Sequence, residues 1–129
     1  MVVGIGIDVV EIARVRRLME RWADRFLRRV FTDAEIAYAL GRHDPAQHLA
    51  ARFAAKEATL KALGTGLSMG IRWREMEVRR GRGEAPRLTL CGRTAELGEA
   101  RGVRRLHVSL THDAGLAVAQ VLAEGEGVT

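Results

Sequence analysis

The sequence predicts an α+β fold whose C-terminal half is antiparallel, because period-two alternation occurs at both ends of the chain and helical periodicity lies between them. The length of 129 residues fits one domain that covers residues 1–129. Hydrophobic residues make up 47% of the chain, enough for a packed core, and no internal repeat or linker interrupts it.

The first predicted element is a strand over residues 2–8. Its residues alternate between an apolar face and a face that consists of Gly4, Gly6 and Asp8. Because glycine has no side chain, another part of the molecule can approach the backbone closely on this second face.

Three helices are expected next. Apolar residues recur every three or four positions from Ile12 through Trp22 to Phe26, which predicts one amphipathic helix. Thr32 begins a second helix, with Glu35 at the spacing of a capping box. The third helix covers residues 46–63 and ends at Gly64.

The C-terminal half is expected to be mainly strands joined by turns. Its predicted elements are a strand near 71–79, a turn at 81–83, a strand at 87–91, a helix at 94–101, strands at 104–111 and 116–123, and a frayed tail at 124–129.

The third helix carries the first candidate site. Lys56 falls in the middle of its apolar stripe, Glu57 lies on the edge of the stripe, and Lys61 follows Glu57 by one turn. A Glu–Lys pair at this spacing is usually an ordinary surface ion pair. This one borders the buried face, however, where a charge needs a partner such as a cation or a phosphate.

The two lysines are also unusual in number. The net charge is +5, which indicates an acidic partner or substrate, and 19 of the 21 basic residues are arginine. Lysine is a compact point charge, whereas arginine is a planar fork. Either chance placed both lysines in one segment, or this segment needs an ammonium group.

Asp8 ends the first strand and has two interpretations. It can be the N-cap of the helix that begins near Ile12. Alternatively, Asp8 and Glu57 form the sparse carboxylate pair that is typical of a Mg²⁺ site completed by water and substrate phosphates.

The late strand places His107, Ser109 and Thr111 on one face. This pattern fits a half-exposed strand. A nucleophilic hydrolase is excluded, because there is no G-x-S-x-G motif and the hydroxyl of Ser109 lies in the middle of a strand.

The first helix carries a row of arginines at steps of three or four residues. A solvated face normally mixes both signs of charge, so the row indicates an acidic partner helix or a phosphate backbone. The six aromatic residues do not intersperse with the row as a base-stacking surface requires, which favours a protein or phosphate ligand over nucleic acid. The row consists of Arg14, Arg17, Arg21, Arg25 and Arg28.

The cellular location is expected to be the cytoplasm. The chain has no apolar run long enough to span a membrane and no basic lead of a signal peptide. Its single cysteine agrees with a reducing compartment.

Together these features resemble one family, the short-class holo-acyl-carrier-protein synthases, which are 4′-phosphopantetheinyl transferases. The resemblance covers nearly the whole chain, in family order. It rests on four segments: GIGIDVVEI at 4–12, FTDAE at 31–35, RFAAKEA at 52–58 with KALGTG at 61–66, and HVSLTH at 107–112.

The resemblance implies a fold in which a largely antiparallel sheet packs against a long helix. It implies that phosphopantetheine moves from coenzyme A to a serine of an apo acyl-carrier protein, releasing 3′,5′-ADP, in fatty acid biosynthesis. Asp8 and Glu57 would hold Mg²⁺, and Glu57 or a metal-bound water would take the serine proton. The catalytic residues would be Glu57 and Lys61, and the residues of the coenzyme A site would be Arg52, Lys61, Gly64, His107 and Thr111.

The resemblance also implies that the arginine row, with Leu18 as an apolar contact, receives the acidic helix of the carrier protein. It implies a homotrimer with active sites between subunits, and neither nucleic acid nor a membrane as a partner. The chain departs from the family pattern at Gln47 and His48, where relatives often place Lys or Arg, and Arg42 is the substitute for contact with the coenzyme 3′-phosphate. The alternative is a basic, non-enzymatic module that binds nucleic acid or an acidic protein.

Overall fold

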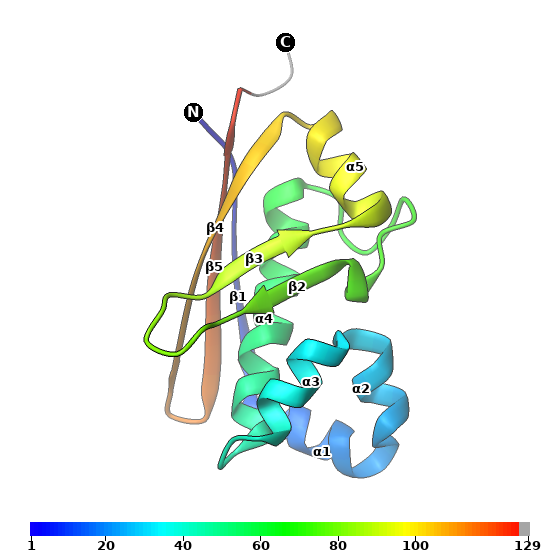
Figure 1. Ribbon diagram of the computed structural model, residues 1–129, viewed down its shortest axis with the longest axis vertical. Coiled ribbons are helices and arrows are strands. Elements are labelled where there is room, and N and C mark those ends of the chain that lie inside the picture. The colour runs from blue at the N-terminus through cyan, green and yellow to red at the C-terminus, as the bar shows by residue number, and fades with distance from the viewer. Residues whose placement is uncertain (127–129) are drawn as a thin grey trace.

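The computed structural model describes residues 1–126. Its centre is a three-stranded antiparallel sheet with the order β1 (Val2–Glu11), β5 (Leu116–Gly125) and β4 (Val103–Asp113). Helix α4 (Pro45–Leu63) runs along one face of this sheet (Figure 1). The expected α+β fold, with a largely antiparallel sheet against a long helix, is therefore confirmed.

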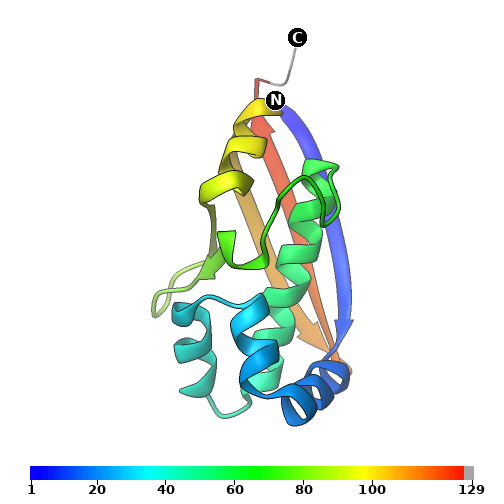
Figure 2. The same ribbon diagram turned by 90° about the vertical axis from the view of Figure 1, so that its right-hand side faces the viewer.

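The other elements surround α4. Three helices gather at one end of it, and the two-stranded sheet β2–β3 lies alongside it near the β4 edge of the main sheet (Figure 2). Most of α4 is buried as a result. These elements are α1 (Ile12–Trp22), α2 (Asp24–Val30), α3 (Asp33–Leu40), the 3₁₀ turn η1 (Trp73–Glu75), β2 (Met76–Arg79), β3 (Arg87–Leu90) and α5 (Gly92–Ala100).

The glycine face of β1 lies directly against α4, as the sequence predicted. A Cβ atom at Gly4 would overlap the carbonyl oxygen of Ala62, and one at Gly6 would overlap that of Ala58. The neighbouring strand β5 contributes small buried side chains to the same face, including Ala117 and Ala119. This close approach fixes the position of β1 relative to one side of α4.

The opposite face of the main sheet is open. Ile5, Ile7 and Val9 are each more than half exposed there, and among residues 1–126 no helix covers them (Figure 1). Strand register places His107 on this same face, since it is opposite Leu122, which is opposite Ile5. An exposed apolar stripe of this kind is typical of an interaction surface.

The prediction of one continuous helix from Ile12 to Phe26 is wrong. The chain breaks at Ala23, where φ is 43° and ψ is −122°, and α2 begins at Asp24. The periodicity in the sequence continues across the break, so it did not reveal a single residue that leaves the helical conformation. Trp22 is consequently 42% exposed instead of lying on the buried stripe.

Several boundaries in the C-terminal half also differ from the expectation. The strand expected near 71–79 begins only at Met76, after η1. The expected helix at 94–101 runs from Gly92 to Ala100. Strand β5 continues to Gly125, whose backbone bonds to Met1, so the part of the tail up to Gly125 is paired, and residues 127–129 lie outside the described residues.

Candidate active site

The meeting point of β1 and α4 brings Asp8 and Lys61 together. The ammonium group of Lys61 donates to the Asp8 carboxylate at 3.1 Å and to the carbonyl of Ile7 at 2.9 Å. Asp8 is on the inward face of β1, beyond the two glycines that allow α4 to approach. Asp8 makes no side-chain cap at α1, whose N-cap is Glu11, so the N-cap interpretation is wrong.

Glu57 lies one turn before Lys61 on α4 and is partly buried. Burial and the negative charge of Asp8 raise the pKa of Glu57, while Lys61 and Arg14 lower it. The two carboxylates are thus close enough to repel each other, although they are 49 residues apart in the chain. Their donor set fits Mg²⁺, which prefers carboxylate oxygen and takes few protein ligands. Within residues 1–126, no group of three or more His, Cys, Asp or Glu residues forms another candidate metal site.

A cavity of about 410 Å³ opens beside these charged groups. Gly64, the C-cap of α4, adopts a left-handed conformation with φ of 73° and turns the chain around the rim. The cavity is lined by Glu57, Leu60, Lys61, Gly64, Gly66, Leu67 and Trp73. The expected grouping of Glu57, Lys61 and Gly64 therefore exists in the structure, whereas Trp73 was missed because its segment was assigned to a strand.

Arg52 lies five residues before Glu57, about 7.5 Å along the helix axis. Its guanidinium is buried 4.3 Å from the ring centre of Tyr38, and its Nε has no hydrogen-bond partner. Burial lowers the pKa of Arg52, and burial together with Arg52 and Arg42 lowers the pKa of His48. A buried donor without a partner among several positive groups is a place for an anion.

Thr111 lines a second cavity of about 90 Å³ together with Arg52 and His48. His107 is different, because it lies on the open face of the sheet, where its Nε2 is 3.2 Å from Glu124. Asp8 is on the inward face. One chain therefore does not bring His107 to the Asp8–Glu57 pair.

The arginine row is divided by the break at Ala23, so the expectation of one row on one helix is wrong. Three of its members are on α1 and two are on α2, and Leu18 is half-buried beside them. Arg14 is near enough to Glu57 to lower the pKa of that carboxyl group. The row therefore begins at the candidate active site and extends away from it.

Lys56 has a role that the sequence did not reveal. Its side chain is fully buried, and its ammonium group donates to Glu35 at 2.6 Å, to the carbonyl of Val30 at 2.7 Å and to that of Trp73 at 3.1 Å. The three N–H donors of the ammonium group thus meet one carboxylate and two carbonyl acceptors. The planar guanidinium of an arginine could not donate in these three directions. A charge at the centre of an apolar stripe required a buried partner, and Glu35, in its capping box with Thr32, was the available carboxylate.

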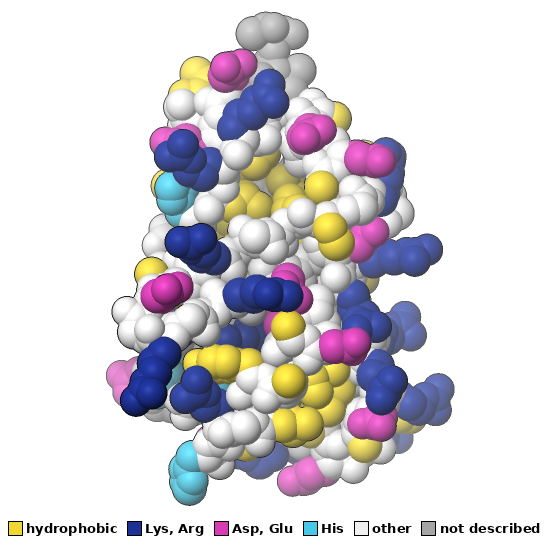
Figure 3. Space-filling view, in the orientation of Figure 1, with side chains coloured by type: hydrophobic (Ala, Val, Ile, Leu, Met, Phe, Trp, Pro, Cys, Tyr) yellow, Lys and Arg dark blue, Asp and Glu magenta, His cyan; other side chains and the backbone are white. Residues whose placement is uncertain are grey.

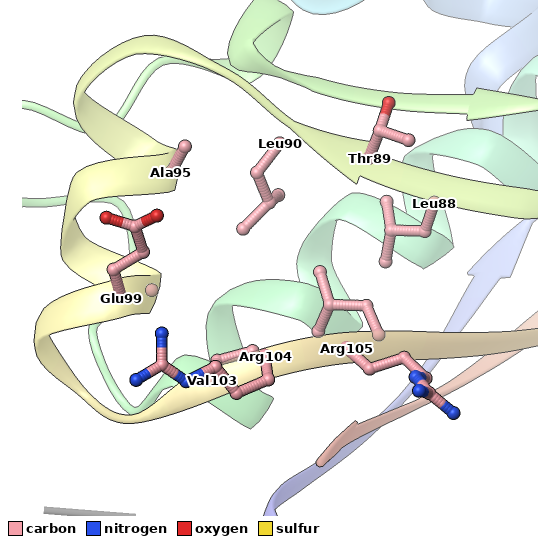
Figure 4. A pocket seen from close by; sticks show the side chains of 10 residues that line it. Leu88, Thr89, Leu90, Ala95, Glu99, Val103, Arg104 and Arg105 are labelled. Carbon is pink, nitrogen blue, oxygen red and sulfur yellow. The ribbon is translucent and has the colours of Figure 1, made fainter. Parts of the chain in front are cut away.

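Another cavity lies elsewhere in the structure. The cavity, of about 300 Å³, separates β3 and α5 from β4 and has leucine walls with Glu99, Arg104 and Arg105 at its edge (Figure 4). It contains none of the predicted site residues. In the part of the chain described, none of the helices has the length and apolar content of a membrane span.

A site with two acidic groups and one ammonium group suits a phosphate-bearing substrate chemically. Residues 4–119 match the model of the 4′-phosphopantetheinyl transferase superfamily, and the chain belongs to this family. It is a phosphopantetheinyl transferase of the short class that the sequence resembled.

The most similar relatives carry one name. The chain is 52% identical over 130 residues to a holo-[acyl-carrier-protein] synthase of Anaeromyxobacter sp. strain K, covering 98% of this chain and 99% of the relative. Among solved structures it resembles the synthase of Neisseria meningitidis, with a TM-score of 0.88, 31% identity and coverage of 96% and 99%. The Helicobacter pylori synthase in complex with coenzyme A gives a TM-score of 0.81, 31% identity and coverage of 93% and 99%.

Proposed function

We propose that this phosphopantetheinyl transferase moves the 4′-phosphopantetheine of coenzyme A to a serine of an apo acyl-carrier protein at the site between β1 and α4, within one domain that covers residues 1–129. The observation that supports this site is the contact of Lys61 with Asp8, with Glu57 nearby and a cavity lined by Glu57 and Lys61. The cytoplasm is the proposed location, in agreement with the single cysteine.

Asp8 and Glu57 would hold Mg²⁺, which neutralises negative charge on the phosphate oxygens when it is bound. Lys61 contributes a further positive charge at the mouth of the same cavity and neutralises charge on the diphosphate. The Gly64 turn brings backbone, without a side chain, to the rim of the cavity that Lys61 lines.

The nucleotide end of coenzyme A is assigned to the positive pocket around Arg52. The unpaired Nε of Arg52 would donate to a phosphate oxygen, and Arg42 lies 4.4 Å from the ring of Tyr38 on the same pocket. The diphosphate then lies toward Lys61, two and a half helical turns farther along α4. This placement orients the β-phosphate toward the carrier serine.

Transfer forms a bond between the serine oxygen and the β-phosphorus and breaks the bond from that phosphorus to the bridging oxygen. The leaving group is 3′,5′-ADP, and the serine proton passes to Glu57 or to water. Because no covalent enzyme intermediate is required, positioning and charge neutralisation account for the catalysis. The carrier itself would dock on Arg14, Arg17, Leu18, Arg21, Arg25 and Arg28.

The direct test is incubation of the protein with coenzyme A, Mg²⁺ and an apo acyl-carrier protein, followed by mass spectrometry of the carrier. A gain of about 340 Da, the mass of phosphopantetheine, is expected. The Glu57→Gln protein is the control and should give no gain. A folded protein that modifies no apo carrier, yet binds nucleic acid in a salt-sensitive manner, would establish the non-enzymatic alternative.

The active unit is proposed to be a homotrimer with sites between subunits. Support comes from the open apolar face around Ile5 and Ile7, and from the position of His107 on that face, away from Asp8. A second copy that covers this face would bring its own His107 toward the Asp8–Glu57 pair.

Subunit mixing tests this arrangement. Glu57→Gln and His107→Ala chains, each nearly inactive alone, are refolded together in equal amounts and compared with each chain refolded separately. Shared sites predict recovery to about a quarter of the wild-type rate, because one combination in four places both intact groups at one site. A mixture no more active than its components would contradict sites shared between subunits.

A further inference from the structure

The break between α1 and α2 changes what the arginine row presents to a partner. Ala23 adopts a positive φ of 43°, which an alanine rarely adopts and which costs about 1–3 kcal/mol. The conformation is held because Leu27 and Val30 of α2 are buried in the core. The break directs Trp22, the last residue of α1, outward and leaves it 42% exposed.

Trp22 is fixed between arginines of both helices. The guanidinium of Arg21 lies 5.0 Å from the centre of the indole ring, and that of Arg25, on α2, lies 5.7 Å from it. These cation–π contacts hold the ring in place while its remaining surface stays in water. A rigid tryptophan next to arginine is the combination that most often dominates the energy of a protein interface.

The charge around Trp22 is mostly uncompensated. Within residues 1–126, the only ion pair made by the row is that of Arg28 with Asp24, at 4.0 Å and fully on the surface. Basic side chains gather along this edge of the molecule, over α2 (Figure 3). The surface therefore combines one apolar ring with several positive groups that lack partners.

We infer that Trp22 is the apolar anchor of the carrier-docking surface, and that its partner is an acidic helix that projects an aliphatic side chain between its carboxylates. This inference rests on the proposed function and adds a residue that the arginine row alone does not supply. The carboxylates contact Arg21 and Arg25, and the aliphatic side chain covers the exposed part of the indole ring. Stacking of nucleic acid bases is disfavoured, because Trp22 is the only exposed aromatic residue within the row, and Phe26 packs against Phe31 and the core.

Kinetics with Trp22→Ala separate anchoring from charge attraction. We expect KM for the apo acyl-carrier protein to rise about tenfold, with kcat and KM for coenzyme A unchanged. Trp22→Phe should recover most of the loss, since it restores an apolar ring. Leu40→Ala is the matched control, because Leu40 is also an exposed apolar residue but lies at the end of α3, and it should leave KM unchanged.

Fluorescence supplies a readout that does not depend on activity. In the Trp73→Phe chain, Trp22 is the only tryptophan, so its emission should shift to shorter wavelength on addition of apo carrier and not on addition of coenzyme A. In the Trp22→Phe chain, Trp73 lines the active-site cavity and should respond to coenzyme A.

The outcomes distinguish failure of the Trp22 anchor from failure of the transferase function. If Arg21→Glu raises KM for the carrier but Trp22→Ala does not, docking depends on charge alone and the anchor is refuted, while the transferase function stands. If a single-stranded oligonucleotide, and not the carrier, changes Trp22 emission, the docking partner is wrong. If the wild-type chain modifies no carrier but apo carrier still shifts Trp22 emission, the transferase function fails and the docking anchor stands. If neither occurs, both are refuted.

Discussion

Replacement of Glu57 by glutamine is expected to lower the rate of phosphopantetheine transfer about 1,000-fold or more. Glutamine has nearly the same shape, but it cannot supply the negative charge that a metal ion needs, nor accept the serine proton. Asp8→Asn should have a similar effect, because both carboxylates lie near Lys61 and near each other. Excess Mg²⁺ should restore little activity.

Stability distinguishes loss of chemistry from loss of structure. Burial and the charge of Asp8 raise the pKa of Glu57. Where Glu57 is ionised, its negative charge therefore lowers the stability of the folded protein. Glu57→Gln should therefore unfold at the same temperature as wild type or a higher one. Glu99→Gln, on the exposed side of α5, is the control and should keep full activity. Near-normal transfer by either Glu57→Gln or Asp8→Asn would mean that the metal assignment is wrong.

Replacement of Lys56 by methionine should lower the free energy of unfolding by about 3–5 kcal/mol. The change leaves the Glu35 carboxylate buried without its cation and removes the donor shared by the carbonyls of Val30 and Trp73. Removing one member of a buried ion pair costs much more than removing both, because the remaining charge has no compensation. Urea denaturation of the purified chains measures the effect.

The other lysine provides the matched control. Lys61→Met removes an ion pair whose ammonium side is half exposed to water, so the free energy of unfolding should change much less, by about 1 kcal/mol. Its transfer rate should nevertheless fall sharply. Adding Glu35→Gln to Lys56→Met should return part of the lost stability. If Lys56→Met costs no more than Lys61→Met, the buried pair does not have the structural role assigned to it.

The difference between Lys56 and Lys61 shows how much of the site could be predicted from the sequence. The two lysines of the chain were recognised as unusual, and Lys61 does lie with Asp8 and Glu57 at the candidate site. Helical spacing placed Lys56 and Lys61 on known sides of α4, but spacing does not show what a distant segment supplies as a partner. Glu35 is 21 residues from Lys56, and only the fold brings them together.

The fold was predictable where local rules apply. The glycine face of the first strand, the capping box at Thr32 and the end of α4 at Gly64 each follow from one residue type at one position, and each is confirmed. The break at Ala23 was not predictable, because alanine favours helix and buried contacts of α2 impose its conformation. The exposure of the apolar face of β1 was also hidden, since the apolar face of an alternating strand normally packs against a core.

The proposed mechanism depends on one arrangement, in which Asp8 and Glu57 share a divalent ion beside Lys61. A crystal soaked with coenzyme A and Mn²⁺, which gives an anomalous signal, tests it most directly. We predict one metal peak in contact with both carboxylates, at distances of about 2.1 Å to oxygen, with the diphosphate next to Lys61. A metal bound by neither carboxylate or by only one of them, with coenzyme A in place, would contradict the account.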